Sequence, residues 1–221
     1  PVGTGITFSP WLGSAALDGG CPPADLHFTP STALVASGAS VGIDLDLSGV
    51  SDLYGYQFRV TFPAAMGMGT GSFVNSFFDT SVNASIPPGW NATCSAGQCL
   101  FAASKVAPGV SVTGTGTLGH INFVGGTPGV YTVSYQGTLL SDSDALPLAV
   151  ITHTAVITVY GQATVSGIVK LQGRATPVTQ GSVTLTDTSG LFPPVNTTFD
   201  ATTGAYLATV PALATGTTYT L

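Results

Sequence analysis

Apolar and polar residues alternate along the chain from about residue 25 onwards. One run places an aliphatic residue at every second position, namely Val41, Ile43, Leu45 and Leu47. The next run places an apolar residue, mostly aromatic, at every second position, namely Tyr54, Tyr56, Phe58, Val60 and Phe62. Because successive side chains of a strand point to opposite faces, each run predicts a strand with one buried side and one solvent-facing side.

Further strands are predicted at residues 98–105, 116–124, 129–137 and 148–160, with Gly, Pro, Ser and Asp in the turns between them. Many short strands at this spacing are typical of an antiparallel β-sandwich. A second pattern of strands follows at residues 163–171, 181–187, 199–206 and 218–221. We therefore predict an all-β chain with a sandwich at residues 25–160 and a second, incomplete β domain at residues 161–221. Residues 1–24 are predicted to be an extended arm or the tail of a preceding domain.

Composition strengthens the all-β prediction and excludes some partners. Charged residues make up 6% of the chain, against about 25% in an average globular protein. There is no Glu, and the chain contains 29 Gly and 15 Pro, which argues against helices. A net charge of −6 without a basic cluster excludes nucleic acid and anionic membranes as partners. No apolar run approaches the roughly 20 residues that a membrane helix needs.

Several features predict an extracellular or cell-surface protein. The sequence begins at Pro1 rather than Met, as expected after removal of a signal peptide or for a piece of a longer chain. Three sequons, at Asn83, Asn91 and Asn196, predict glycosylation.

The cysteines point in the same direction. Cys94 and Cys99 flank a four-residue turn sequence inside a predicted hairpin, so a disulfide there is plausible and would contribute about 2 kcal/mol. Two free thiols are the alternative. Cys21 is left over, which suggests a partner outside this segment.

Candidate catalytic chemistry is sparse. Residues 114–119 read Gly-Thr-Gly-Thr-Leu-Gly, the spacing of a dinucleotide-binding loop, but a strand follows where that loop needs a helix. His27, His120 and His153 fall on separate predicted strands and favour structural or surface roles. Asp44 and Asp46 share a strand face, yet an open face offers no desolvation to raise the pKa of a general acid. We therefore predict that the chain is not an enzyme and has no cofactor.

Two other groups of residues carry weaker hypotheses. Asp142 and Asp144 are the best oxygen ligands for a structural Ca²⁺, and a solvated turn is the alternative. The aromatic residues Trp11, Phe77, Phe78 and Trp90 lie in or near loops, and at most two of them are expected to be exposed.

The sequence from about residue 25 to residue 160 resembles a cohesin module. The resemblance rests on residues 26–32, on the strand at 38–47, on residues 48–62 and, later, on residues 114–123 and 128–133. It implies a nine-stranded jelly-roll sandwich that binds a dockerin-like module through one sheet face and performs no chemistry. The family usually has Asp-Pro after its third strand, whereas this chain has Phe62-Pro63.

This resemblance, combined with the strand alternation, predicts a partner-binding face. The outward residues of two strands that we expect to be adjacent would form it, namely Gln57, Arg59, Thr61, His120 and Asn122. Arg59 is one of four basic residues in the chain, and Arg is enriched at interface hot spots.

Residues 161–221 resemble a transthyretin-like domain, of the carboxypeptidase regulatory-like type. Such a domain has about seven strands, and four are readable here, so another segment is expected to complete it. An open sheet edge invites addition of a strand from another chain. The arm at residues 4–12 is partly apolar and would suit donation, so the protein is predicted to dock end to end or to polymerise into a fibre.

Two functions follow from these observations. The first is a non-catalytic structural or protein-interaction protein, a cohesin-like module in a cell-surface assembly or in a fibre of copies of itself. The alternative is a carbohydrate-binding module of a larger secreted polysaccharide-degrading enzyme. Polysaccharide binding requires two or three coplanar aromatic rings on an exposed face, and the predicted strand faces carry polar side chains instead. The sequence therefore favours the first function.

Overall fold

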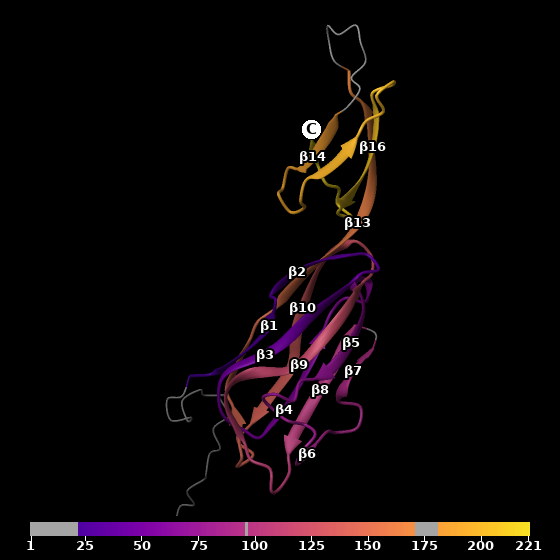
Figure 1. Cartoon of the computed structure of the whole chain (residues 1–221). Coiled ribbons are helices and arrows are strands. Elements are labelled where there is room, and N and C mark those ends of the chain that lie inside the picture. Colours follow the sequence, from indigo (N-terminus) through magenta and orange to yellow (C-terminus); the bar gives the residue numbers. More distant parts are fainter. Residues whose placement is uncertain (1–21, 96, 171–180) are drawn as a thin grey trace, which may run out of the picture.

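The computed structural model describes residues 22–95, 97–170 and 181–221 (Figure 1). The regular secondary structure of these residues is almost entirely β-strand, and the single helical element among them is the short 3-10 helix η1 (Ala64–Met66). The predicted all-β class is confirmed. Residues 1–21 of the predicted arm, with Trp11 and Cys21, lie outside the described residues, and the last arm residue, Ala24, is the buried first residue of a strand, so the predicted boundary at 24/25 is one residue late.

The strands form two packed sheets and a small third sheet. The first sheet has the order β12-β1-β3-β9-β5, with bounds Val150–Thr152, Ala24–Thr29, Ser40–Leu53, Val112–Gly125 and Gly67–Phe73. The second has the order β16-β13-β10-β4-β8-β6, with bounds Ala205–Ala212, Ala155–Ile168, Gly129–Ser141, Gly55–Thr61, Gln98–Lys105 and Ala84–Ser85. Three more strands pair with members of the second sheet: β11 (Pro147–Leu148), β2 (Thr32–Ala36) and β7 (Asn91–Ser95). The third sheet is β15-β14-β17, with bounds Val195–Thr198, Ser182–Asp187 and Tyr219–Thr220.

Most strand pairs are antiparallel, as predicted, and two pairs are parallel. β1 pairs with β12, and β2 pairs with β13. These pairs join the beginning of the sandwich sequence to its end. The single strand predicted at residues 148–160 is three strands, because the chain crosses between the sheets twice. It passes from β11 in the second sheet to β12 in the first at Ala149, and back to β13 in the second near His153.

Aromatic side chains fill the space between the two large sheets. Phe58 of β4 is fully buried and stacks on Phe101 of β8, with ring centroids 5.4 Å apart. Tyr135 of β10 meets Phe58 edge to face and stacks on Phe28 of β1, which belongs to the opposite sheet. The alternation predicted along β3 and β4 is confirmed, since the apolar positions of both strands face this core.

β13 continues beyond the sandwich into the second β part (Figure 1). Residues up to Tyr160 pair with β10 and β2, and residues from Gly161 onwards pair with β16. A second core lies beside this continuation and contains Val183, Leu185, Tyr206, Ala208 and Val210. The predicted boundary at residues 160/161 therefore falls inside one continuous strand, and the division into two domains stays a prediction.

The strand predicted at residues 199–206 is wrong. Residues 200–204 of this stretch form the turn between β15 and β16, because the carboxylate of Asp200 accepts hydrogen bonds from the backbone N–H groups of Thr202 and Thr203. Ala205 and Tyr206 already belong to β16. Gly204 closes the turn with a φ of 72°, which favours glycine. Within the described part of the chain, no helix is long and apolar enough to cross a membrane.

Candidate functional site

The outer surface of β4 carries three of the predicted site residues. Phe58 and Val60 are buried, so Gln57, Arg59 and Thr61 face solvent on the other side of the strand. The hydroxyl of Thr61 lies 3.0 Å from that of Ser134 on the neighbouring strand β10. These three predicted residues therefore share one surface.

Arg59 is the dominant polar group of this surface. Its guanidinium lies 5.6 Å from the ring centroid of Trp90, within cation–π range. Trp90 lies just before β7 and is held against β8, because its carbonyl accepts a hydrogen bond from the N–H of Ala102. β10, β4 and β8 contain one further charged residue, Lys105, and it is buried. Among the described residues, no carboxylate forms a salt bridge with Arg59.

Uncharged side chains surround Arg59. Its direct cross-strand neighbours are Gln136 on β10 and Leu100 on β8. Leu139 of β10 lies opposite Gln57 and is 61% exposed. We call this surface the Arg59 face and define it as Gln57, Arg59, Thr61, Trp90, Leu100, Gln136 and Leu139.

Exposed aliphatic residues continue the same surface towards β13. Val130 of β10 is 65% exposed, and Thr158 of β13 separates it from Leu34 of β2. In the next row of paired residues, Val156 of β13 lies between Thr132 of β10 and Thr32 of β2. The outer side of the large sheet is thus an almost uncharged surface with one cation.

The predicted adjacency of the two site strands is wrong. β4 lies between β10 and β8 in the second sheet, whereas β9 lies between β3 and β5 in the first. His120 and Asn122 therefore lie on the opposite outer surface from Arg59. Both strands have the same inward apolar alternation, which does not say which sheet a strand joins.

The outer surface of the first sheet has a different character. His120 Nδ1 lies 2.6 Å from a carboxylate oxygen of Asp44, and the Thr117 hydroxyl donates to Asp46. Asp25 is bonded by both His27 and His153. The three histidines, which the sequence suggested were scattered, therefore lie on one sheet surface, each paired with an aspartate. We call it the Asp–His face.

The Asp25 cluster gives a prediction about pH. Desolvation raises the pKa of Asp25, but hydrogen bonds and charge interactions from His153 and His27 outweigh it, so the pKa lies below its ordinary value of 3.8. Folding therefore favours the ionised form, and this contribution is lost as the pH falls through the lowered pKa. For so exposed a cluster it is below about 1 kcal/mol. In urea unfolding at about pH 5 and about pH 3, Asp25→Asn should lose less stability on acidification than the wild type. An unchanged pH dependence, matching that of an Asp144→Asn control, would contradict this.

The Asp–His face does not form a catalytic triad. Ser72, His120 and Asp44 occupy one row across β5, β9 and β3. However, the imidazole of His120 leans over Gly42 and away from β5, since a Cβ at position 42 would lie 2.6 Å from its Cε1 atom. A pocket of about 270 Å³ beside the disulfide is lined by apolar residues, glycines and Ser95, with no histidine or carboxylate. Neither place therefore brings a serine, a histidine and a carboxylate together as a triad.

The two calcium candidates lie in the turn after β10. One carboxylate oxygen of Asp142 accepts the backbone N–H groups of Asp144 and Leu146, so it closes the turn. Asp144 is exposed, and the described residues contain no group of three or more acidic, His or Cys residues placed to hold a metal. The geometry shows a capped turn, and the Ca²⁺ hypothesis stays untested.

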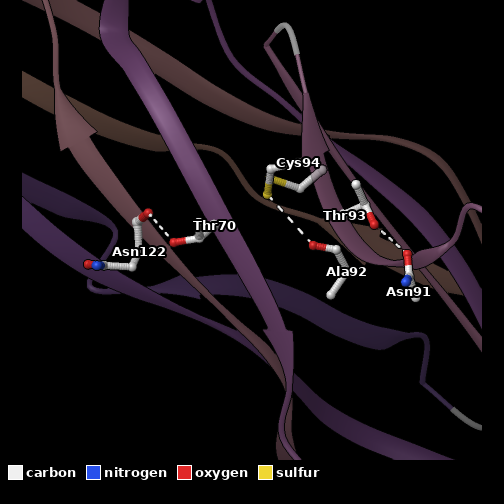
Figure 2. The surroundings of a disulfide bond; sticks show 7 residues. Thr70, Asn91, Ala92, Thr93, Cys94 and Asn122 are labelled. Carbon is white, nitrogen blue, oxygen red and sulfur yellow. Dashed lines mark hydrogen bonds between the residues drawn. A yellow bond between two sulfur atoms is a disulfide. The ribbon is translucent and has the colours of Figure 1, made fainter.

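The predicted disulfide between Cys94 and Cys99 is present and joins β7 to β8 (Figure 2). Next to it, the hydroxyl of Thr93 donates a hydrogen bond to the side-chain oxygen of Asn91. All three sequon asparagines, Asn83, Asn91 and Asn196, are exposed.

The candidate aromatic anchors differ in their environment. Phe78 is fully buried, while Phe77 and Trp90 are half-buried. Trp90 is the one that lies on the Arg59 face. Burial against a core favours a packing role for Phe78, and its ring also lies 4.7 Å from the Nζ atom of Lys105.

No family model matches the sequence, and no curated protein matches it. Solved structures do match. A cohesin of Clostridium acetobutylicum, solved in complex with a dockerin, has 14% identity and a TM-score of 0.51, covering 62% of this chain and 99% of the cohesin. A type I cohesin–dockerin complex from Clostridium thermocellum gives 10% identity, a TM-score of 0.51 and the same coverage. The sandwich shares the cohesin fold. The resemblance of residues 161–221 to transthyretin-like domains stays a prediction.

Proposed function

We propose that this chain is a non-catalytic protein-interaction module that binds a protein partner through the Arg59 face. The observation that carries the proposal is the Arg59–Trp90 pair, which lies on an otherwise uncharged surface with exposed aliphatic side chains. Arg and Trp are enriched among residues that dominate binding energies. Cohesins of the same fold have been solved in complexes with dockerins, which supports a protein partner here.

The partner of this proposal is a dockerin-like module, and the setting is an extracellular or cell-surface assembly. The second candidate partner is another copy of the same chain in a fibre, and the test must distinguish it from a dockerin-like module. Polysaccharide binding is less well supported, because the exposed large apolar side chains of the described residues are all aliphatic. Stacking on sugar rings needs exposed aromatic rings.

The test compares variants on the two outer surfaces. Purified dockerin modules are titrated into the protein by calorimetry, and self-association is measured by sedimentation velocity. Arg59→Ala should weaken the observed association by about 30-fold or more, which corresponds to about 2 kcal/mol. His120→Ala, on the Asp–His face, is the matched control and should leave the affinity unchanged.

Three results would contradict the proposal. Equal affinity of Arg59→Ala and the wild type would show that the Arg59 face is a solvated surface. A larger loss for His120→Ala would move the interaction to the Asp–His face. If neither dockerin binding nor self-association occurs in the wild type, the proposed partners are wrong.

A further inference from the structure

Asn91 lies at the edge of the Arg59 face. Arg59 is paired with Leu100 of β8, and Leu100 is paired in turn with Thr93 of β7. Strands lie about 4.8 Å apart, so Thr93 is about 10 Å from Arg59 along this row. The Thr93 hydroxyl bonds the side chain of Asn91, and Trp90, the residue before Asn91, contacts Arg59. The sequon is therefore built into the same surface as the cation.

The local structure makes Asn91 available for modification. Asn91 and Thr93 are both exposed, and β7 is hydrogen-bonded to β8 on one side. Between them Ala92 is buried and has a φ of 60°, at an irregularity of the β7–β8 register. Thr93 bonds the amide oxygen of Asn91 (Figure 2), while the amide nitrogen has no hydrogen-bond partner among the described residues. That nitrogen is the atom to which an N-linked glycan is attached.

We propose that Asn91 carries an N-linked glycan that covers the Arg59 face and so controls access of the partner, an inference that rests on the proposed function. The donor is an oligosaccharide linked to a lipid through a diphosphate. The Asn91 amide nitrogen forms a bond to the anomeric carbon of the first sugar and loses one proton. The bond from that carbon to the diphosphate oxygen breaks, and the lipid diphosphate leaves. The attached glycan is bulky and solvated, and it is linked to the residue next to Trp90.

The other two sequons lie elsewhere and serve as internal comparisons. Asn83 directly precedes β6 in the sequence. In space it lies next to the last residues of β8, where its carbonyl accepts a hydrogen bond from the N–H of Val106. Asn196 lies on β15 in the third sheet, where its side chain accepts the hydroxyl of Thr184. Neither asparagine lies in the row of paired residues that joins Arg59 to Thr93.

The experiment measures occupancy and shielding without needing a partner. The whole chain is secreted through a eukaryotic N-glycosylation pathway, and peptide mass spectrometry gives the occupancy of each sequon. The protein is then treated with phenylglyoxal, an arginine reagent. The chain has two arginines, so Arg174 serves as the internal standard for the reagent dose. We expect Asn91 to be occupied and Arg59 to react severalfold more slowly than in enzymatically deglycosylated protein.

Two variants separate the glycan from the side chain. Asn91→Gln removes the acceptor, and Thr93→Ala removes the sequon but keeps Asn91, so both should restore fast modification of Arg59. Asn196→Gln should leave the shielding intact. An unmodified Asn91 in molecules glycosylated at Asn83 or Asn196, or equal Arg59 reactivity with and without the glycan, overturns the proposal. If Arg59→Ala does not change partner affinity while the glycan shields Arg59, the proposed function has failed and the shielding stands.

Discussion

Replacing Phe58 by Ala should lower the free energy of unfolding by about 3–5 kcal/mol. Phe58 is fully buried and contacts Tyr56, Phe101 and Tyr135. Tyr135 in turn stacks on Phe28 of the other sheet, so the cavity would lie where the two sheets pack. Urea unfolding followed by circular dichroism measures the loss.

Tyr56→Phe is the matched control in the same aromatic cluster. The Tyr56 hydroxyl is buried and has no hydrogen-bond partner among the described residues. Removing it relieves an unsatisfied polar group, so stability should stay equal or rise by about 1 kcal/mol. A loss from Tyr56→Phe comparable to that from Phe58→Ala would show that the ring contacts are not what stabilises this core.

Gly71→Ala should destabilise the protein by about 3 kcal/mol, near the upper end for overpacked sites. β7 lies against β5 here, and a Cβ at position 71 would overlap the backbone carbonyl oxygen of Ala92. A backbone atom cannot rotate away as a side chain can, so the two strands must separate. The loss is measured as a shift of the urea midpoint at constant slope.

Ser72→Ala is the control for this substitution. Ser72 is the next residue of β5 and is exposed, so its replacement should change stability by less than about 0.5 kcal/mol. If Gly71→Ala is as mild as Ser72→Ala, β5 and β7 are not in close contact in solution.

The local structure of the sandwich could be predicted from the sequence. The alternation along β3 and β4 identified the buried side of each strand, and the turn between Cys94 and Cys99 identified the hairpin and its disulfide. Both signals act over a few residues. They result from side-chain direction and turn chemistry, which do not depend on the rest of the fold.

Sheet membership could not be predicted in the same way. The pairing of β4 with β10, which lies about seventy residues later, leaves no trace in the alternation of either strand. As a result, His120 was assigned to the same surface as Arg59. The cluster of His27 and His153 on Asp25 was missed for the same reason, because it depends on the parallel pairing of β1 with β12.

The turn at Asp200 is a miss of another kind. The sequence Asp-Ala-Thr-Thr-Gly at residues 200–204 contains a turn-capping carboxylate and a glycine, which together predict a turn. A turn at these residues separates Phe199 from Tyr206 and makes β16 begin after Gly204. Here the signal was present in the sequence.

The continuity of β13 fixes the spacing between the two β parts. A strand of 14 residues spans about 45 Å, and β13 passes without a loop from its pairing with β10 and β2 to its pairing with β16. A partner bound on the Arg59 face and any segment joined near β16 would therefore be held a set distance apart. The direction between them is set by the twist of one strand rather than by the random reach of a linker.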